Sequence, residues 1–121
     1  MFTIMVVDDE QEIRSLYSTV LSGEGYQVVA VESCSEATKN LENQQIDLVV
    51  LDIQLKQQKS GLDMLKILVE GYSRLPVILC SAHYSYYYTD HTAWLADEYI
   101  VKNSNLSELK EKIGNLLNKL N

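Results

Sequence analysis

Residues 46–53 read IDLVVLDI, which is the most apolar run in the chain. A short run rich in Val, Leu and Ile is typical of a parallel strand that helices cover on both faces. The run carries Asp52 near its end, and burying a charge there costs free energy unless the charge is paired or has a function. This stretch therefore predicts a central strand with a chemically important residue at its carboxyl end.

Segments with the patterns of strands and helices alternate on both sides of this run. The predicted strands are residues 3–7, 26–31, 46–53, 75–82 and 97–101. Apolar residues three and four positions apart predict helices at residues 12–23, 33–41, 62–72 and 105–120. Ser33 followed by Glu36 matches a capping box, and Gly23 supplies a helix stop. Residues 83–94 are rich in Tyr and Thr, and we expect a short fourth helix there.

Strict alternation of strands and helices predicts an α/β fold with right-handed crossovers. We expect a (βα)5 doubly wound domain over residues 1–121, in three layers, with a five-stranded parallel sheet in the order 2-1-3-4-5. Ligands bind such sheets at the carboxyl ends of the strands, where the winding direction reverses. In this strand order, that point lies between strands 1 and 3.

The composition limits the classes of function. The 121-residue chain is 46% hydrophobic and 22% charged, which suits one compact domain. Its net charge of −7 argues against direct nucleic-acid binding, which requires a basic face. No apolar run reaches the roughly 20 residues of a membrane span, and no secretory signal opens the chain, so we expect a cytoplasmic protein without membrane contact. Cys34 and Cys80 match no zinc or CxxC motif, and we expect reduced thiols.

Polar residues stand at the carboxyl ends of four predicted strands or directly after them. They are Asp8 and Asp9 after the first, Asp52 at the third, Ser81 at the fourth and Lys102 after the fifth. Carboxylates 4 Å apart repel each other by about 4 kcal/mol at an effective dielectric constant near 20, so a cation must hold them together. Lys102 and a hard divalent ion such as Mg²⁺ are the two candidates. A carboxylate beside Mg²⁺, a lysine and a hydroxyl suits an aspartate that attacks phosphorus.

Five motifs accompany these residues along the chain. They are VVDDE at 6–10, LVVLDIQL at 48–55, GLDML at 61–65, VILCSA at 77–82 and EYIVKN at 98–103. Together they resemble the receiver domain of two-component response regulators, the CheY-like superfamily with its flavodoxin-like topology, over essentially the whole chain. The resemblance implies a signalling switch that catalyses its own Mg²⁺-dependent phosphorylation from a phosphohistidine and slowly hydrolyses the product.

The resemblance also implies roles for individual residues. Asp52 corresponds to the phosphoacceptor. Asp8, Asp9 and Asp52, with the backbone carbonyl of Gln54, correspond to the ligands of Mg²⁺, for which Mn²⁺ is expected to substitute. Lys102 corresponds to the lysine that pairs with the phosphoryl group once it arrives.

Two further residues correspond to the family's switch. Ser81 matches the hydroxyl residue that bonds a phosphoryl oxygen, and Tyr99 matches the aromatic residue that moves inward with it. Phosphorylation adds about −1.5 to −2 charge, enough to bias a two-state arrangement. The changed surface is expected around the fourth helix, the fifth strand and the fifth helix, through which a homodimer can form. The implied partners are a sensor histidine kinase or His phosphotransfer protein, and a downstream target or an output domain.

Departures from the family pattern keep a second function open. Asn103 replaces the proline that usually follows the lysine in a cis peptide, and Leu55 and Lys56 replace the usual Met-Pro. The alternative is a phosphorylation-independent interaction module with the same fold. An aspartyl-phosphate hydrolase would need an acid in place of Gln54, and a nucleotide-binding domain would need a glycine-rich motif that this sequence lacks.

Overall fold

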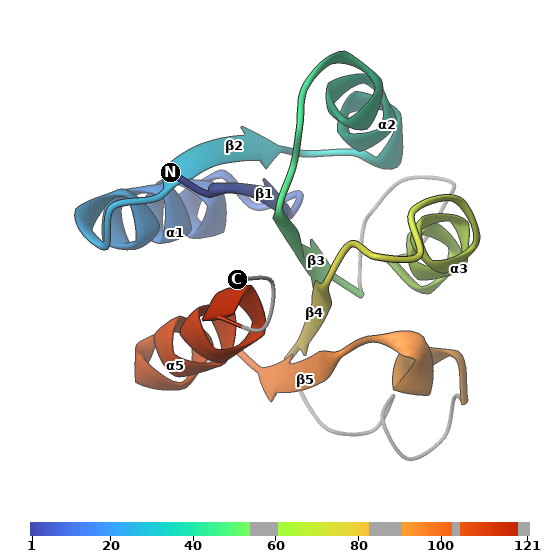
Figure 1. Cartoon of the computed structure of the whole chain (residues 1–121). Coiled ribbons are helices and arrows are strands. Elements are labelled where there is room, and N and C mark those ends of the chain that lie inside the picture. Colours follow the sequence, from blue (N-terminus) through green and yellow to red (C-terminus); the bar gives the residue numbers. More distant parts are fainter. Residues whose placement is uncertain (54–60, 83–90, 103–104, 119–121) are drawn as a thin grey trace.

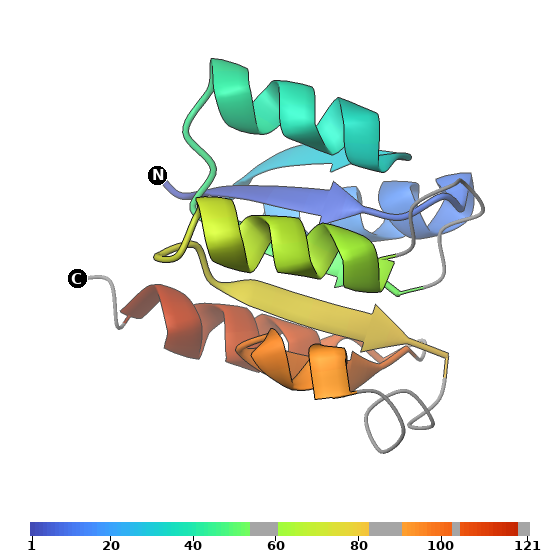
Figure 2. The ribbon, with the colours of Figure 1, turned by 90° about the vertical axis from the view of Figure 1, so that its right-hand side faces the viewer.

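The computed structural model describes residues 1–53, 61–82, 91–102 and 105–118 and shows one parallel sheet. Its strands are β1 Thr3–Val7, β2 Gln27–Val31, β3 Leu48–Asp52, β4 Val77–Ser81 and β5 Glu98–Val101. They lie in the order β2-β1-β3-β4-β5, and each neighbouring pair is parallel (Figures 1 and 2). The predicted doubly wound fold and strand order are confirmed.

Helices cover both faces of the sheet. They are α1 Gln11–Gly23, α2 Cys34–Asn43, α3 Gly61–Gly71, the 3-10 helix η1 His91–Leu95 and α5 Ser107–Asn118. Helices α1 and α5 lie on one face, and α2, α3 and η1 lie on the other (Figure 1). Of the predicted fourth helix, residues 83–90 lie outside the described residues, and the described part is η1. Among the described helices, none is both long and apolar enough to cross a membrane.

The central strands are buried along their whole length, as their apolar sequences predict. Every residue of β1, β3 and β4 is buried. Successive side chains of a strand point to opposite faces, so Ile4 and Val6 join the layer beneath α1 and α5, whereas Met5 and Val7 join the layer beneath α2 and α3. Burial of each such side chain contributes about 2 kcal/mol, which makes the sheet a firm support for its carboxyl edge.

Two helices begin beside side chains that accept hydrogen bonds from N–H groups of the first turn, and one of these is the predicted Ser33 cap. Ser33 Oγ accepts a hydrogen bond from the Glu36 N–H at 3.2 Å, which starts α2. The Glu36 carboxylate accepts from the N–H of Glu32 at 3.5 Å, one residue before the partner that a capping box would use. At α5, Asn105 Oδ1 accepts from the Ser107 N–H at 2.9 Å. Both caps place the helix starts within two residues of the predicted positions.

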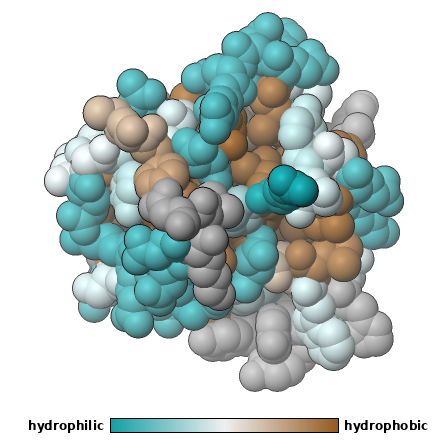
Figure 3. Space-filling view, in the orientation of Figure 1, coloured by the Kyte–Doolittle hydropathy of each residue, from teal (hydrophilic) through white to brown (hydrophobic). Residues whose placement is uncertain are grey.

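At the amino ends of β4 and β1, two aspartates each make the same pair of hydrogen bonds with the first residue of the strand. The Asp97 N–H donates to the Val77 carbonyl at 2.9 Å, and Asp97 Oδ2 accepts from the Val77 N–H at 2.8 Å. Asp47 makes the equivalent pair of bonds with Thr3, both at 2.8 Å. Figure 3 looks onto this end of the molecule, where hydrophilic side chains surround a centre in which hydrophobic ones are visible. The aspartates thus satisfy backbone donors at the edge of the core.

Asp97→Ala is expected to destabilise the fold by about 1 to 2 kcal/mol, because it leaves the Val77 N–H without its acceptor. The free energy of unfolding in urea measures the effect. Asp97→Asn keeps an oxygen acceptor at the same position and is expected to lose less than half as much. Equal stability of the alanine variant and the unsubstituted chain would show that the contact contributes nothing.

The two cysteines are free thiols in different environments. Cys80 is buried in β4, whereas Cys34 at the start of α2 is partly exposed. Burial raises the pKa of the Cys80 thiol from 9.0 to about 12. Because this folded-state pKa exceeds the unfolded value, the neutral thiol's contribution to stability is complete below pH 9.0 and is lost as the pH rises towards 12.

We expect the folded protein to react with Ellman's reagent at one thiol, Cys34, and the unfolded protein at two. The physical reason is that Cys80 has 1% of its surface exposed and remains protonated at mildly alkaline pH. Peptide mapping of the modified protein identifies the reacting residue. Fast modification of Cys80 in the folded protein would contradict its burial.

Candidate functional site

Four strands deliver polar side chains to the carboxyl edge of the sheet. Asp52 and Ser81 are the last residues of β3 and β4, while Asp8 and Lys102 directly follow β1 and β5. Since β1, β3, β4 and β5 are consecutive neighbours in the sheet, these residues meet at one edge, where the arrowheads lie in Figure 2. The structure therefore brings together acids that are more than forty residues apart in the sequence, next to one lysine.

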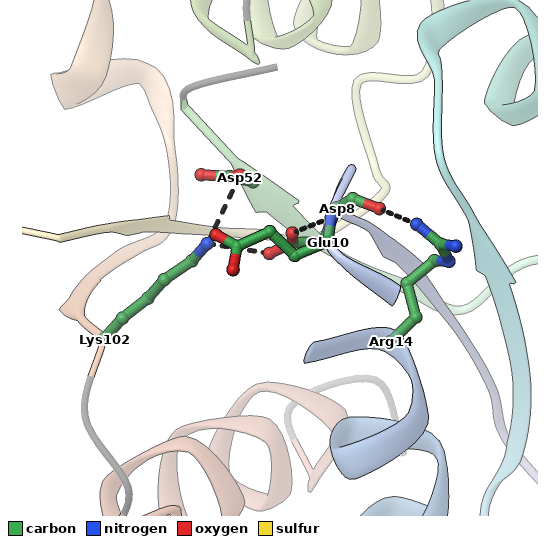
Figure 4. Close-up of polar contacts among 5 residues, drawn as sticks. All are labelled: Asp8, Glu10, Arg14, Asp52 and Lys102. Atoms are coloured by element: carbon green, nitrogen blue, oxygen red, sulfur yellow. Dashed lines mark hydrogen bonds and ion pairs between the residues drawn. The ribbon is translucent and has the colours of Figure 1, made fainter. Parts of the chain in front are cut away.

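Lys102 joins the two buried acids. Its Nζ lies 2.7 Å from Asp8 Oδ2 and 3.2 Å from Asp52 Oδ2 (Figure 4). The side chains of Asp8 and Asp52 are 2% and 5% exposed, so water screens these ion pairs weakly. Burial of Lys102 lowers its pKa, but the hydrogen bond to Asp8 and the charge of Asp52 outweigh this, and the net pKa is raised above 10.5. Lys102 is therefore the charged internal counter-ion of both carboxylates.

Asp8 is held by its backbone as well as by its side chain. Its N–H donates to the Val31 carbonyl at 3.1 Å, and its Oδ1 accepts from the Glu10 N–H at 2.9 Å. Its carbonyl accepts from Arg14 Nη1 at 2.9 Å. Figure 4 shows that Lys102 and Arg14 approach Asp8 from opposite sides. The orientation of this acid is thus fixed by contacts from α1, β2 and β5.

Three acids cluster in the connection from β1 to α1. One carboxylate oxygen from each of Asp8, Asp9 and Glu10 lies within 4.8 Å of the others, and exposure increases from buried Asp8 to exposed Glu10. Mg²⁺ takes oxygen ligands, typically one or two carboxylates together with water. These carboxylates fit the ligands of such a hard divalent cation. Lys102 links Asp52 to this cluster, because its amine contacts both Asp8 and Asp52.

Gly61 lies directly against the backbone of Asp52. Its N–H donates to the Ile53 carbonyl at 2.9 Å at the start of α3. A Cβ at this position would overlap the Asp52 carbonyl oxygen and would lie 2.7 Å from both the Asp52 carbonyl carbon and Ile53 Cα. Only glycine permits this approach, so the start of α3 fixes the backbone that carries Asp52.

The other residues that the sequence singled out lie in β4, in β5 and outside the described part of the chain. Ser81 is fully buried, and its carbonyl accepts from the Lys102 N–H at 2.7 Å. Tyr99 is half-buried in β5 and packs against the core layer beneath α2 and α3. Gln54 and Asn103 lie outside the described residues. The movement of Tyr99 and the carbonyl ligand at Gln54 stay predictions.

The sequence interpretation missed the contributions of Arg14 and Gly61. Arg14 was visible only as one polar residue on an amphipathic helix, although it stands one helical turn after Glu10 and can reach back to the acids. Gly61 was visible as the residue before a predicted helix and as the first residue of the GLDML motif, but its approach to the Asp52 backbone was not. Both roles depend on contacts between separate elements, which the local pattern does not encode.

Comparison with known proteins gives the class of protein. The family model of the response regulator receiver domain matches residues 4–114. The response regulator TrrA of Thermotoga maritima, solved in complex with Mg(2+)-BeF, is 40% identical with a TM-score of 0.89, over 96% of this chain and 99% of that one. TrrA in complex with the histidine kinase ThkA gives 42% identity and a TM-score of 0.88, over 97% and 99%. The chain belongs to the response regulator receiver domain family.

Some response regulators are longer than the matched region. The response regulator SaeR of Staphylococcus aureus is 34% identical over 118 residues, which is 97% of this chain. The chain spans 51% of the length of SaeR, so about half of that regulator lies outside the match.

Proposed function

We propose that the chain is a phosphoacceptor domain in which the Asp52 carboxylate takes a phosphoryl group from a phosphohistidine. The observation that carries this proposal is the position of Lys102, whose amine contacts Asp8 and Asp52 at once beside the acid cluster. A carboxylate nucleophile with a cation at its oxygen and hydroxyl support nearby is the arrangement that aspartyl phosphorylation needs. Membership in the receiver family supports the same assignment.

The proposed reaction uses the chain's own residues in named roles. An oxygen of Asp52 attacks phosphorus, the new O–P bond forms, and the P–N bond to the donor histidine breaks. The Lys102 amine lies 3.2 Å from Asp52 Oδ2, and its positive charge would stabilise the oxygens of the arriving phosphoryl group. Mg²⁺, held by Asp8, Asp9, Asp52 and the carbonyl of Gln54, would neutralise charge on the transferring group, and Mn²⁺ would substitute for it.

The response to phosphorylation is proposed to run through β4 and β5. The Ser81 hydroxyl would donate a hydrogen bond to a phosphoryl oxygen. Ser81 pairs with Val101 of β5, and Tyr99 on that strand would move inward. The addition of about −1.5 to −2 charge at the sheet edge is large enough to bias such a two-state element. The surface around residues 83–94, β5 and α5 would then change its affinity for a partner.

The proposed partners follow from the same chemistry. A sensor histidine kinase or a His phosphotransfer protein would supply the phosphoryl group, in line with the complex of TrrA and ThkA. A downstream target or an output domain would read the changed surface, and a homodimer through residues 83–94, β5 and α5 is one such output. A cytoplasmic location and a single receiver domain over residues 1–121 remain predictions.

Incubation with acetyl phosphate and Mg²⁺ tests the proposed function. The expected result is a gain in intact mass of one phosphoryl group per chain, which disappears when EDTA removes the metal. Circular dichroism with and without EDTA provides the control for folding. No mass gain with acetyl phosphate or phosphoramidate, in a folded protein with Mg²⁺ present, would instead favour the phosphorylation-independent interaction module.

A further inference from the structure

The connection between β1 and α1 carries all three acids of the cluster. It comprises residues 8–10, between the end of β1 at Val7 and the start of α1 at Gln11. Its backbone therefore decides where the three carboxylates point. The last ladder contact before the connection is the bond from the Asp8 N–H to the Val31 carbonyl, and Glu10 at the N-cap of α1 makes no side-chain cap. Within the connection the Glu10 N–H donates to Asp8 Oδ1 at 2.9 Å, and contacts from outside the connection hold the rest of its path.

Arg14 supplies contacts at both ends of this connection. Its backbone N–H donates to the Glu10 carbonyl at 3.1 Å, and its Nη1 donates to the Asp8 carbonyl at 2.9 Å. Its Nη2 lies 3.9 Å from Glu32 Oε2, in the segment after β2. The Arg14 side chain is only 19% exposed, so the guanidinium is held between α1, the connection and this segment (Figure 4).

We propose that Arg14 is a positioning residue that sets the divalent-cation affinity of the acid cluster by fixing the Asp8–Glu10 backbone. The inference rests on the proposed function, since it assigns a determinant to the same cation site. Arg14 touches no carboxylate of the cluster in the described contacts, and it acts through the Asp8 carbonyl. Partners that orient metal ligands in this indirect way change metal affinity by about tenfold or more when they are removed.

Charge alone predicts the opposite result, which makes the sign of the effect decisive. The guanidinium is a positive charge near the acids, and it repels a second cation. If repulsion were its only influence, removal of Arg14 would tighten cation binding. If positioning dominates, removal weakens binding, because the carboxylates lose their common orientation. Glu32, close to Nη2, already compensates part of the positive charge and so reduces the repulsive contribution.

Calorimetric titration of the full chain with MgCl₂ measures the affinity without any phosphoryl transfer. We expect Arg14→Met to weaken Mg²⁺ binding about tenfold, because it keeps the aliphatic stem but removes the donors. Arg14→Lys keeps the charge, but a single amine cannot make both guanidinium contacts, and we expect binding about threefold weaker. Arg74→Met is the matched control: it removes the same charge from an exposed residue before β4, at the opposite edge of the sheet, and should leave the affinity unchanged.

The outcomes separate this inference from the function on which it rests. Mg²⁺ binding by Arg14→Lys as tight as that of the unsubstituted chain overturns the inference, and this variant decides the matter if Arg14→Met does not fold. Tighter binding by Arg14→Met also overturns it and assigns the residue a purely electrostatic influence. Failure of the unsubstituted chain to bind Mg²⁺ contradicts the proposed function itself, and the inference falls with it.

Discussion

Asp52→Asn is expected to abolish phosphorylation by acetyl phosphate while the chain keeps its fold. The amide lacks the nucleophilic carboxylate. Among the described acids, Asp52 is the one that both ends β3 and contacts Lys102. The fold should persist because asparagine has nearly the same size and because the substitution removes one of two carboxylates that share a single lysine. Intact-mass spectrometry after incubation with the donor and Mg²⁺ measures the loss, and circular dichroism checks the fold.

Asp63→Asn provides the matched control for this result. It makes the same chemical change on an exposed residue in the first turn of α3 and should leave the mass gain unchanged. Persistent phosphorylation of the Asp52 variant, at a rate similar to that of the Asp63 variant, would show that the phosphoryl group goes elsewhere.

Gly61→Ala is expected to destabilise the fold by about 3 kcal/mol and to slow phosphorylation by about a hundredfold. The added methyl group would overlap the Asp52 carbonyl oxygen, and the neighbouring contacts at 2.7 Å are to backbone atoms that have no rotamer with which to give way. The chain must therefore move either the start of α3 or the residue that carries the proposed nucleophile. Urea unfolding gives the stability, and the rate of mass gain gives the chemistry.

Gly71→Ala, at the other end of α3, tests whether the effect belongs to the position or to the residue type. A Cβ at Gly71 would meet nothing within 4 Å, so this substitution should be neutral or stabilise the helix by about 0.5 kcal/mol. A Gly61→Ala variant that is as stable and as rapidly phosphorylated as the Gly71 variant would contradict the close approach to Asp52.

The sequence was sufficient for the topology and for the meeting of the acids because both follow from simple geometry. Apolar runs such as IDLVVLDI, separated by helical patterns, leave few arrangements other than a parallel sheet covered on both faces. Once the strands are parallel, residues at their carboxyl ends share one edge. The prediction that Asp8, Asp52 and Lys102 lie together needed only the strand order, which the structure has.

The details that remained hidden depend on distances between elements. Lys102 Nζ lies closer to Asp8 Oδ2 than to Asp52 Oδ2, 2.7 Å against 3.2 Å, and the strand order alone does not give this difference. The contact of Arg14 with the Asp8 carbonyl needs the tilt of α1, and the constraint on Gly61 needs the approach of α3 to β3. Periodicity within a segment carries no information about these quantities.

Borohydride trapping of the phosphorylated protein tests the central claim most directly. Borohydride reduces an aspartyl phosphate to homoserine, so peptide mass spectrometry after treatment with acetyl phosphate, Mg²⁺ and borohydride locates the modified residue. The account predicts homoserine at position 52 and at no other aspartate, with none formed in the presence of EDTA. Homoserine at Asp8 or Asp9, or none at any position in the folded protein, would contradict it.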